Sequence, residues 1–578
     1  MYMKLYSTLL CIVLGFLSPL QINGFVPMGN GESSTMFFRG NGHSVVTSRS
    51  EQDIPQSEKN NKKSSKRLRF MNKLGFKRVS KDQKEIREAA KKTSPPEKFE
   101  ITNLKDLDSY FEDKEERFRN KNGEIDSDLL IRSLSVCGDT QIIGSTERLD
   151  YVHPVAKLLA ERKANGSQCV EGGKREDGCK IALVVEGGGM RGCISGGMVC
   201  ALNHLGLRDA FDVVYGSSAG SVVGAYFITG QLKWFGPELY YDKLTTAGKE
   251  FIDTSRLLRV LGVGLADPRL FKDVLARRNN GKPVLSLEFL LKKTMQQSKP
   301  LDWAKFVERQ KVQPLKVVAS GLKREEAVVM DMEHGHFSSL NEMSECMHGS
   351  CLLPGIAGPT MNIKINDSDT EKPKFVLHNG LHDPDYEPLG DALVRGPIPY
   401  ESAHKEGATH VVVLRSRADG TDVTGKGGVL ERLIFRRFFL RKNKIPRAFH
   451  YMSNQLHKKL YAKNIIELNE AAHDTRDYKD TSKPHTLTVA LAPGSEEIAR
   501  LETGREAIFD GFRRGFARAY DALVEDPKER GRGHIVAREY FPDEIMDYIP
   551  EDISRVDDSA FQIYMDQESI SPKSWAKK

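Results

Sequence analysis

Two glycine-rich turns, each lying between an apolar run and a helical pattern, constrain the fold of this chain more than any other feature. The first is Ile181-Ala-Leu-Val-Val-Glu-Gly-Gly-Gly-Met-Arg-Gly192, and the second is Val213-Val-Tyr-Gly-Ser-Ser-Ala-Gly220. Uninterrupted apolar runs of this kind are typical of strands that are buried on both faces of a parallel sheet. Two successive strand–turn–helix units predict an α/β domain with a mainly parallel central sheet.

The same alternation continues along the chain. Apolar runs predict strands at residues 315–320, 327–330, 410–414 and 487–491, and periodicity predicts helices at 193–205, 219–229, 401–407 and 504–523. This pattern favours a three-layer sandwich, with helices on both faces of the sheet. A chain of 578 residues is long enough for one large α/β core and further segments outside it.

The second turn has the form of a nucleophile elbow. Gly216 and Gly220 stand two positions before and after Ser218, so the backbone can fold sharply between strand and helix without Cβ clashes. The hydroxyl of Ser218 then projects at the carboxyl end of the sheet, where the N-terminus of the following helix favours negative charge. Ser218 is therefore the predicted nucleophile.

The first turn suits an oxyanion hole. Acyl transfer develops a negative oxygen that needs two or more aimed donors, and a run of glycines lets successive backbone N–H groups converge on one point. Arg191 adds a fixed positive charge or holds the loop. The predicted oxyanion-hole residues are Gly187, Gly188, Gly189, Arg191 and Gly192.

Nucleotide binding is the competing interpretation of this turn. The spacing Gly187-x-Gly189-x-x-Gly192 also fits a dinucleotide fingerprint, which expects an acidic residue at the end of the next strand. Asp212 stands at the start of that strand, and the strand ends in the serine turn instead. A second glycine-rich stretch at residues 420–427 approaches a phosphate-binding loop, but Gly427 replaces the Ser or Thr that would hold Mg²⁺.

A serine nucleophile needs a base, and a carboxylate is the most visible candidate. None of the 15 histidines stands in an obvious triad order. Asp391 follows a glycine in a loop that Pro397 and Pro399 stiffen, and an aspartate bonded to a serine Oγ can act as base in a desolvated pocket. From this stretch alone, an ordinary turn aspartate is the alternative.

Taken together, these motifs strongly resemble the patatin-like phospholipases, most closely the bacterial-type branch. The resemblance rests on Glu-Gly-Gly-Gly-Met-Arg-Gly at residues 186–192, Gly-Ser-Ser-Ala-Gly at 216–220, and Asp391 ahead of Pro-Ile-Pro-Tyr. Weaker support comes from residues 267–271, 282–288, 350–355 and 401–414, so that the similar region extends over about 181–525.

The resemblance implies a lipid acyl hydrolase that uses a Ser–Asp dyad. Ser218 would be the nucleophile, Asp391 its base, and the amides of Gly188 and Gly189 the oxyanion hole, with Arg191 nearby. The implied substrate is a glycerolipid, and neither cofactor nor metal is expected. Two residues depart from the family pattern: Ala392 stands where Gly usually follows the aspartate, and Glu186 stands where Asp is common.

Ala392 leaves a second hypothesis open. Alanine does not easily adopt a positive φ, so a loop that needs such a conformation would misplace the dyad. The alternative function is a catalytically weak lipid-binding or scaffolding protein on the same fold, and the separation of Ser218 and Asp391 distinguishes the two. The sequence does not define the oligomeric state.

The N-terminus has the features of a signal peptide. Lys4 precedes an apolar core at residues 9–17, which is shorter than the roughly 20 residues that span a bilayer. An uncleaved anchor helix is the alternative. Phe25 and the Ser/Thr/Gly/Asn-rich stretch after it resemble the bipartite leaders of algae with secondary plastids. The expected location is the endomembrane lumen or secretion, with a plastid as alternative.

A basic, polar segment follows the leader, with Lys62, Lys66, Lys77 and Lys91 among its charges and Pro95-Pro96 at its end. We expect a disordered linker. The alternative is an electrostatic tether to anionic lipid, whereas nucleic-acid binding is not expected because few aromatic residues accompany the charge. The predicted division is 1–24 signal peptide, 25–98 basic linker or transit segment, 99–178 helical extension, 179–400 catalytic core, 401–530 remainder of the same domain, and 531–578 tail.

Two further stretches bear on membranes and redox state. Residues 432–442 combine bulky apolar and basic side chains, and we expect a helix that packs its apolar face on the core; the alternative is a helix lying in an anionic membrane surface. Separately, we expect the protein to associate peripherally with a membrane surface. The cysteine pairs 169/179 and 346/351 are close enough in sequence to be oxidised in a lumen, and no CxxC spacing indicates zinc.

Overall fold

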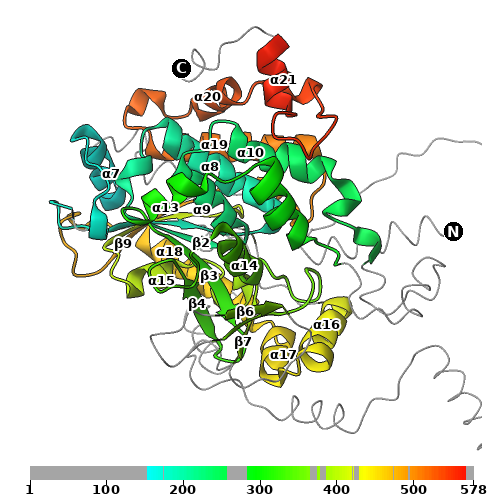
Figure 1. The fold of residues 1–578 in the computed structure, drawn as a ribbon. Helices are drawn as coiled ribbons and strands as arrows, with labels where there is room; N and C mark the ends of the chain where they lie inside the picture. Colours follow the sequence, from blue (N-terminus) through cyan, green and yellow to red (C-terminus); the bar gives the residue numbers. More distant parts are fainter. Residues whose placement is uncertain are drawn as a thin grey trace, which may run out of the picture.

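The protein folds around a nine-stranded sheet with helices on both faces (Figure 1). The computed structural model describes residues 153–173, 175–256, 283–364, 374–377, 386–419, 421, 423, 428–472, 474–492 and 495–567. The predictions for the leader, the basic linker, residues 99–152, residues 267–271 and most of the 420–427 stretch lie outside these residues. The expected α/β class with a mainly parallel central sheet is confirmed.

The centre of the sheet is parallel. Its strands are β1 (Ile181–Val185), β2 (Val213–Ser217), β3 (Leu315–Gly321), β8 (His410–Leu414) and β9 (His485–Val489), in the order β3-β2-β1-β8-β9. Val184 pairs with Tyr215 on one side and with Val413 on the other. All residues of β1 are buried, as expected for a strand covered on both faces.

An antiparallel extension continues the sheet beyond β3. It contains β4 (Glu326–Met330), β5 (Met361–Lys364), β6 (Lys374–Leu377) and β7 (Tyr386–Gly390), in which β7 and β4 both pair with β3 and β5 lies between β7 and β6. Of these, only β4 was expected from the apolar pattern, because β5 and β7 contain polar residues and a proline. The extension brings the end of β7 next to β3.

The helical elements have the following bounds. The α-helices are α7 (Pro154–Ala164), α8 (Gly192–His204), α9 (Ala219–Thr229), α10 (Phe235–Glu238), α13 (Trp303–Gln310), α14 (Leu340–Ser350), α15 (Tyr400–Lys405), α16 (Val429–Phe435), α17 (Pro446–Ser453), α18 (Leu456–Ala471), α19 (Arg505–Leu523), α20 (Gly533–Tyr540) and α21 (Ala560–Gln567). The π-helical segments are η6 (Leu239–Leu244), η10 (Phe289–Ser298) and η12 (Arg436–Lys442). Short 3-10 turns include η4 (Gly189–Arg191) and η11 (Ala392–Val394).

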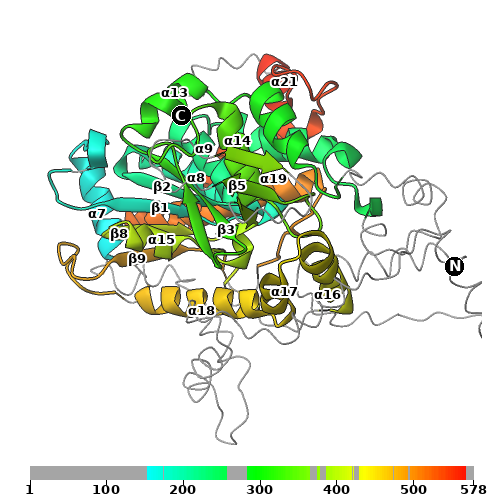
Figure 2. The same ribbon diagram turned by 60° about the horizontal axis from the view of Figure 1, so that its bottom comes forward.

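The helices form two layers. Helices α8, α9 and α19 lie together on one face of the sheet, and α15 and α18 lie on the other (Figures 1 and 2). Helix α9 is buried along its whole length, which explains why its sequence is apolar on every side. A Cβ on Gly197 of α8 would lie 2.0 Å from the carbonyl oxygen of Phe512 of α19, so the two backbones are in direct contact.

The N-terminal extension is tied to the core by a buried charge cluster. Arg162 of α7 donates to Asp212 at 2.8 Å and to Asp177 at 2.7 Å, and Arg175 pairs with the other oxygen of Asp212. Asp212 also accepts the backbone N–H of Ile181 at 2.7 Å. The acidic residue that a dinucleotide site would need is thus buried and fully paired at the start of β2, which argues against that interpretation.

The C-terminal segment packs on the same body. Phe561 of α21 stacks on Trp234 with ring centroids 4.6 Å apart, and Ala537 and Phe541 are buried against the core. Lys243 of η6 donates to two backbone carbonyls of this segment. The predicted tail therefore contains folded structure at least over α20 and α21.

The structure also describes the 432–442 stretch and the two candidate cysteine pairs. In the 432–442 stretch the apolar residues Ile434, Phe435, Phe438, Phe439 and Leu440 are buried, as the preferred packing interpretation expects. The cysteines of both candidate pairs are free thiols. Within the described residues, no helix has both the length and the apolar character that crossing a bilayer requires.

Candidate active site

Ser218 lies in a strained turn between β2 and α9. Its φ and ψ are 51° and −127°, a backbone conformation that a non-glycine residue adopts only where the surrounding structure imposes it. The turn is too tight for side chains beside it: a Cβ on Gly216 would lie 2.4 Å from Ser221, and one on Gly220 would lie 2.1 Å from the carbonyl oxygen of Val185. Both glycines thus have the structural role expected of an elbow.

Neighbouring serines hold the elbow in place. The N–H of Ser218 donates to Ser350 Oγ at 2.7 Å, and Ser350 in turn donates to the carbonyl of Val318 in β3. Ser217 Oγ donates to the carbonyl of Pro397 at 3.2 Å. The strain at Ser218 is therefore supported from β3 and from the loop after Asp391.

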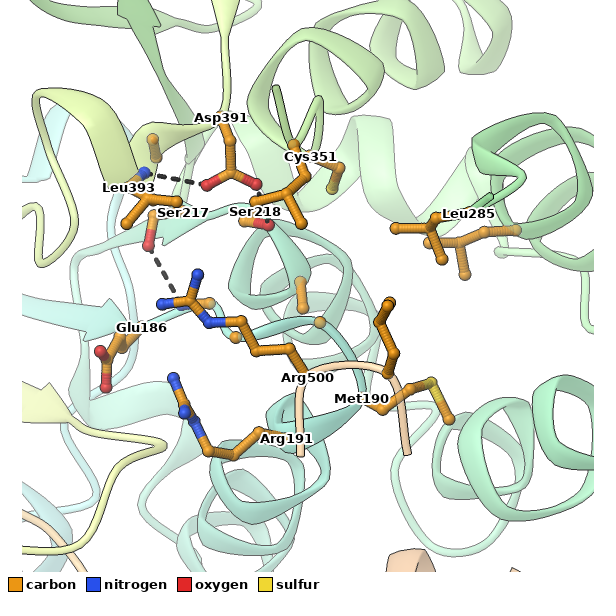
Figure 3. Close-up of a pocket in the computed structure, with 18 of the residues that line it drawn as sticks. Glu186, Met190, Arg191, Ser217, Ser218, Leu285, Cys351, Asp391, Leu393 and Arg500 are labelled. Atoms are coloured by element: carbon orange, nitrogen blue, oxygen red, sulfur yellow. Dashed lines mark hydrogen bonds between the residues drawn. The ribbon is translucent and has the colours of Figure 1, made fainter. Parts of the chain in front are cut away.

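Asp391 meets Ser218 directly. The distance from Ser218 Oγ to Asp391 Oδ2 is 3.0 Å, and the other carboxylate oxygen accepts the N–H of Leu393 at 2.9 Å (Figure 3). The backbone of Asp391 is fixed by bonds to the carbonyl of Leu352 and to Ser320 Oγ. The residue follows the last strand of the antiparallel extension, so β7 delivers it to the end of β2.

Alanine at position 392 does not disturb this geometry. Ala392 begins the 3-10 turn η11 and does not have a positive φ. The loop therefore does not need the conformational freedom of a glycine at this position. The distance of 3.0 Å between Ser218 Oγ and Asp391 Oδ2 is within the range that proton transfer between them needs. The expectation that Ala392 misplaces the aspartate, which suggested a catalytically weak protein, is therefore not supported.

Burial changes the pKa of Asp391, the candidate base. Its side chain is 6% exposed, and desolvation raises the pKa of its carboxyl group above the usual 3.8. The N–H of Leu393, the charge of Arg500 and the hydroxyl of Ser218 act in the opposite direction. A carboxylate with a raised pKa accepts a proton from a serine hydroxyl more readily than an exposed one.

The glycine loop offers two amides that have no partner within the described part of the chain. The N–H of Gly187 donates to Ser217 Oγ at 3.1 Å, and the N–H of Met190 donates to the carbonyl of Arg500 at 3.0 Å. Gly188 and Gly189 stand between Gly187 and Met190 in the chain. Their N–H groups donate no hydrogen bond to any described residue. Gly188 and Gly189 are thus the available donors, whereas Gly187 shapes the loop.

The remaining predicted loop residues have structural roles. Gly189 has a φ of +62°, and a Cβ there would lie 2.5 Å from the carbonyl oxygen of Arg500. Gly192 opens α8 and its N–H closes η4. Arg191 is 1% exposed; its Nε donates to Ser416 Oγ at 3.3 Å and its Nη1 lies 4.0 Å from Glu497.

Through these contacts Arg191 links the glycine loop to Ser416 and to Glu497. Burial, together with the charges of Arg417 and Arg500, lowers the pKa of Arg191 to about 10. Glu186 completes the support, because its carboxylate accepts the N–H of Ser416 at 2.7 Å and the hydroxyl of Tyr461 at 2.7 Å. The longer side chain at position 186 is accommodated by these two partners.

A cavity opens over the dyad. It contains about 820 Å³ of empty space, part of which is open to solvent. Figure 3 shows Arg191, Arg500 and Glu186 on one side of Ser218 and Leu285 on the other. The apolar part of the lining consists mainly of Met190, Leu244, Phe251, Leu285, Leu287, Leu290, Leu353, Leu393 and Leu501. A long apolar ligand fits such a lining, with its reactive group at Ser218.

One group of candidate metal ligands lies away from this cavity. Asp331, Glu333 and His334 come close to one another, but the ammonium group of Lys316 lies 2.9 Å from Asp331 and 3.7 Å from Glu333. An ammonium group of the protein itself is therefore already paired with the carboxylates of this cluster, and with Glu406 at 2.9 Å.

Sequence reasoning did not assign roles to several residues of the site. Ser217 stands inside the elbow motif and Ser350 inside a stretch that resembles the family, so both were within recognisable signals. Arg500 was not, because it lies in an irregular loop after β9 with no motif around it. Its position follows only from the long-range contact with Met190.

Comparison with known proteins agrees with this geometry. Residues 183–403 match the family model described as patatin-like phospholipase. The match includes both glycine turns and Asp391, and it supports lipid acyl hydrolysis as the general activity. A solved structure, VipD from Legionella pneumophila, is 12% identical, with a TM-score of 0.25, over 61% of this chain and 69% of that one. No curated protein matches the chain.

Proposed function

We propose that the patatin-like phospholipase domain of this chain is a serine lipid acyl hydrolase that cleaves ester-linked fatty acids from glycerolipids. The observation that carries the proposal is the 3.0 Å hydrogen bond between Ser218 and Asp391 beneath an apolar cavity. A nucleophile with a base in contact, two unpaired amides beside it and a lipid-like lining form a consistent set for acyl transfer.

The first half of the reaction forms an acyl-enzyme. As Ser218 Oγ attacks the ester carbonyl, its proton passes to Asp391, and the amides of Gly188 and Gly189 stabilise the oxyanion of the tetrahedral intermediate. When the intermediate collapses, the carbon–oxygen bond to the alcohol breaks, and protonated Asp391 returns the proton to the departing oxygen. Each aimed donor to the oxyanion contributes about 3 kcal/mol to lowering the barrier.

The second half releases the fatty acid. A water molecule takes the place of the alcohol and gives a proton to Asp391 as it attacks the acyl-enzyme. Collapse of the second intermediate breaks the bond to Ser218 Oγ, which recovers its proton from Asp391. The same dyad and the same amides act in both halves.

The lipid would be reached from a membrane surface. Leu433 is 46% exposed on α16, and the exposed basic residues Arg432, Arg441, Lys442 and Lys444 lie on the same stretch of chain. An exposed apolar residue among basic ones suits peripheral contact with anionic lipid. The N-terminal leader supports delivery to the endomembrane lumen or outside the cell, and the stretch after Phe25 supports a plastid as the alternative.

The test uses the full-length protein and phosphatidylcholine vesicles. The wild type should release free fatty acid, and Ser218→Ala should lower the rate by at least about 10³-fold because the nucleophile is lost. Ser554→Ala, an exposed serine in the C-terminal segment, is the matched control and should retain full activity.

A covalent probe gives an independent result. A fluorophosphonate should label Ser218, and labelling should disappear in Ser218→Ala. If the wild type neither releases fatty acid nor reacts with the probe, the catalytically weak lipid-binding alternative replaces the hydrolase. Undiminished hydrolysis by Ser218→Ala would remove this serine from the mechanism altogether.

A further inference from the structure

Arg500 places a guanidinium group at the reactive end of the cavity. The carbonyl of Arg500 accepts the N–H of Met190, and Gly189 approaches the same carbonyl closely, so the backbone of Arg500 is fastened to the glycine loop. Its side chain extends along the loop toward Ser217 and Ser218 (Figure 3). Arg500 lines the cavity together with the dyad.

No carboxylate of the described residues is in direct contact with this guanidinium, although the charges of Asp391 and Glu186 lie near enough to act on it. No hydrogen bond or ion pair engages its side chain, and its Nε is buried without an acceptor. Arg500 as a residue is partly buried, and a buried donor such as its Nε is costly to leave without an acceptor unless a ligand supplies one. The group therefore has the properties of an anion-binding site that a substrate completes.

The acidic side chains around Arg500 are engaged elsewhere. Glu186 accepts from Ser416 and Tyr461, and Glu497 lies between Arg417 at 3.4 Å and Arg191 at 4.0 Å. Asp391 accepts from Ser218 and Leu393. Burial lowers the pKa of Arg500, and repulsion from the charge of Arg417 lowers it further, whereas the charges of Asp391 and Glu186 act in the opposite direction. An additional anion would relieve this repulsion.

The opposite side of the cavity is apolar. Leu285 lies across Ser218 from Arg500 in Figure 3, and Leu287, Leu290 and Phe251 belong to the same lining. A glycerolipid whose ester carbonyl reaches Ser218 and whose acyl chain lies along the leucines would direct its remaining glycerol substituent toward Arg500. A guanidinium group binds phosphate with two parallel hydrogen bonds, whereas it gains little from an uncharged hydroxyl or sugar.

We infer that Arg500 is a specificity-determining residue that binds the phosphate diester of a glycerophospholipid and so selects phospholipids over neutral glycerides and galactolipids. The inference rests on the proposed hydrolase function, since it names the substrate class of the same site. It gives Arg500 a role in substrate recognition that neither the catalytic dyad nor the amides of the glycine loop fulfil.

The test compares two lipids that carry the same pair of oleoyl chains, phosphatidylcholine and diacylglycerol, in mixed detergent micelles. Neither lipid adds net charge to the micelle, so the electrostatic attraction of the protein to the micelle surface is the same for both. The variants are Arg500→Gln, Arg500→Lys and, as control, Arg538→Gln, which removes an exposed arginine from α20. Each rate is measured on the pH plateau of that variant, because Arg500 also affects Asp391.

Arg500→Gln should lower kcat/KM for phosphatidylcholine by about tenfold to hundredfold, mainly through KM, and change diacylglycerol hydrolysis by less than about threefold. Arg500→Lys should recover part of the loss, and the control should match the wild type. If both lipids lose activity equally in Arg500→Gln, the residue stabilises the loop or the oxyanion and the inference is wrong. If Arg500→Gln changes the rate with neither lipid, the inference is wrong as well.

A binding measurement separates this inference from the hydrolase proposal. Ser218→Ala protein is titrated with dihexanoyl phosphatidylcholine below its micelle concentration, with and without Arg500→Gln. A Kd raised about tenfold by Arg500→Gln supports the inference even if the wild type hydrolyses neither lipid. If inorganic phosphate binds in an Arg500-dependent manner and the short lipid does not, the site takes a free anion and phospholipid selection is excluded.

Discussion

The two walls of the cavity are built in different ways. On the reactive wall, Ser218, Asp391 and the glycine loop are each fixed by hydrogen bonds, by backbone strain or by contacts too close for another side chain. On the apolar wall, the side chains of Leu285, Leu287 and Leu290 are buried and can make only apolar contacts. Directional interactions fail when one atom is displaced, whereas dispersion contacts are many and individually weak. The reactive wall should therefore decide whether the reaction occurs, and the apolar wall which chain is accepted.

The largest effect is expected from removing the base. Asp391→Asn keeps an oxygen that can accept the N–H of Leu393 but cannot take the proton of Ser218. Hydrolysis should fall by about 10³-fold, within the range that general base catalysis supplies. Fatty acid release from phosphatidylcholine is the measurement, and a loss of less than tenfold would mean that another group acts as base.

The same substitution should not destabilise the protein. An aspartate whose pKa is raised on folding favours the folded state at low pH, and this stability is lost as pH rises from the unfolded value of 3.8 through the folded value. At neutral pH the ionised carboxylate opposes folding, and the asparagine removes that penalty. The melting temperature of Asp391→Asn should therefore equal or exceed that of the wild type at pH 7; a clear decrease would indicate misfolding rather than loss of the base.

A smaller loss is expected in the glycine loop. Gly189→Ala places a Cβ against the carbonyl of Arg500 at a φ of +62°, so the loop must shift and at least one amide leaves the oxyanion position. The rate kcat should fall by about 10²-fold with little change in KM. Gly335→Ala, at a similar φ but with open space around its Cβ, controls for backbone strain alone. Equal losses in the two variants would show that strain, and not the amide position, is responsible.

The pH dependence reports on the burial of the base. Hydrolysis needs ionised Asp391, so kcat/KM should decrease as pH falls through the pKa of this residue, with a midpoint above the usual 3.8 because burial raises it. Arg500→Gln removes a charge that lowers this pKa, and the midpoint should move to higher pH. A shift to lower pH in Arg500→Gln would contradict the arrangement of charges around the dyad.

The smallest effects are expected on the apolar wall. Leu285→Trp narrows the cavity without touching the dyad, so hydrolysis of a p-nitrophenyl butyrate should stay within about twofold of the wild type. Hydrolysis of the palmitate should decrease by about threefold to tenfold, because the longer chain needs the space. Ile535→Trp, at an exposed position on α20, is the control for added surface bulk. A common loss for both esters would show that the apolar wall also supports the reactive one.

The difference between the walls also explains what the sequence could predict. The strands β1 and β2, helix α9 and Ser218 follow from a continuous stretch, because each strand–turn–helix signal is local. Asp391 lies 173 positions from Ser218. Its loop made it a candidate base, but from that stretch alone an ordinary turn aspartate was the alternative, and the resemblance to a family strengthened the assignment. The antiparallel strands β5 to β7, which bring Asp391 to Ser218, were not predicted because their polar residues hide the usual alternation.

Arg500 lies beyond such reasoning for a physical reason. It occupies an irregular loop, and neither its spacing nor its neighbours distinguish it from the many other arginines of this basic chain. Its importance comes from a single long-range bond to Met190 and from the absence of an acceptor for its side chain among the described residues. Both are properties of the folded arrangement and leave no pattern in the sequence.

The bond between Arg500 and Met190 makes the glycine turn depend on a part of the chain that lies beyond the family match. The segment that matches the family model ends at residue 403, before β8, β9 and α19. Strand β8 is the partner of β1, and the loop after β9 fastens the glycine turn from outside. If residues 183–403 were joined to the C-terminal half of another protein, that half would have to supply a strand that pairs with β1. It would also have to supply a carbonyl group that accepts the N–H of Met190, as Arg500 does here.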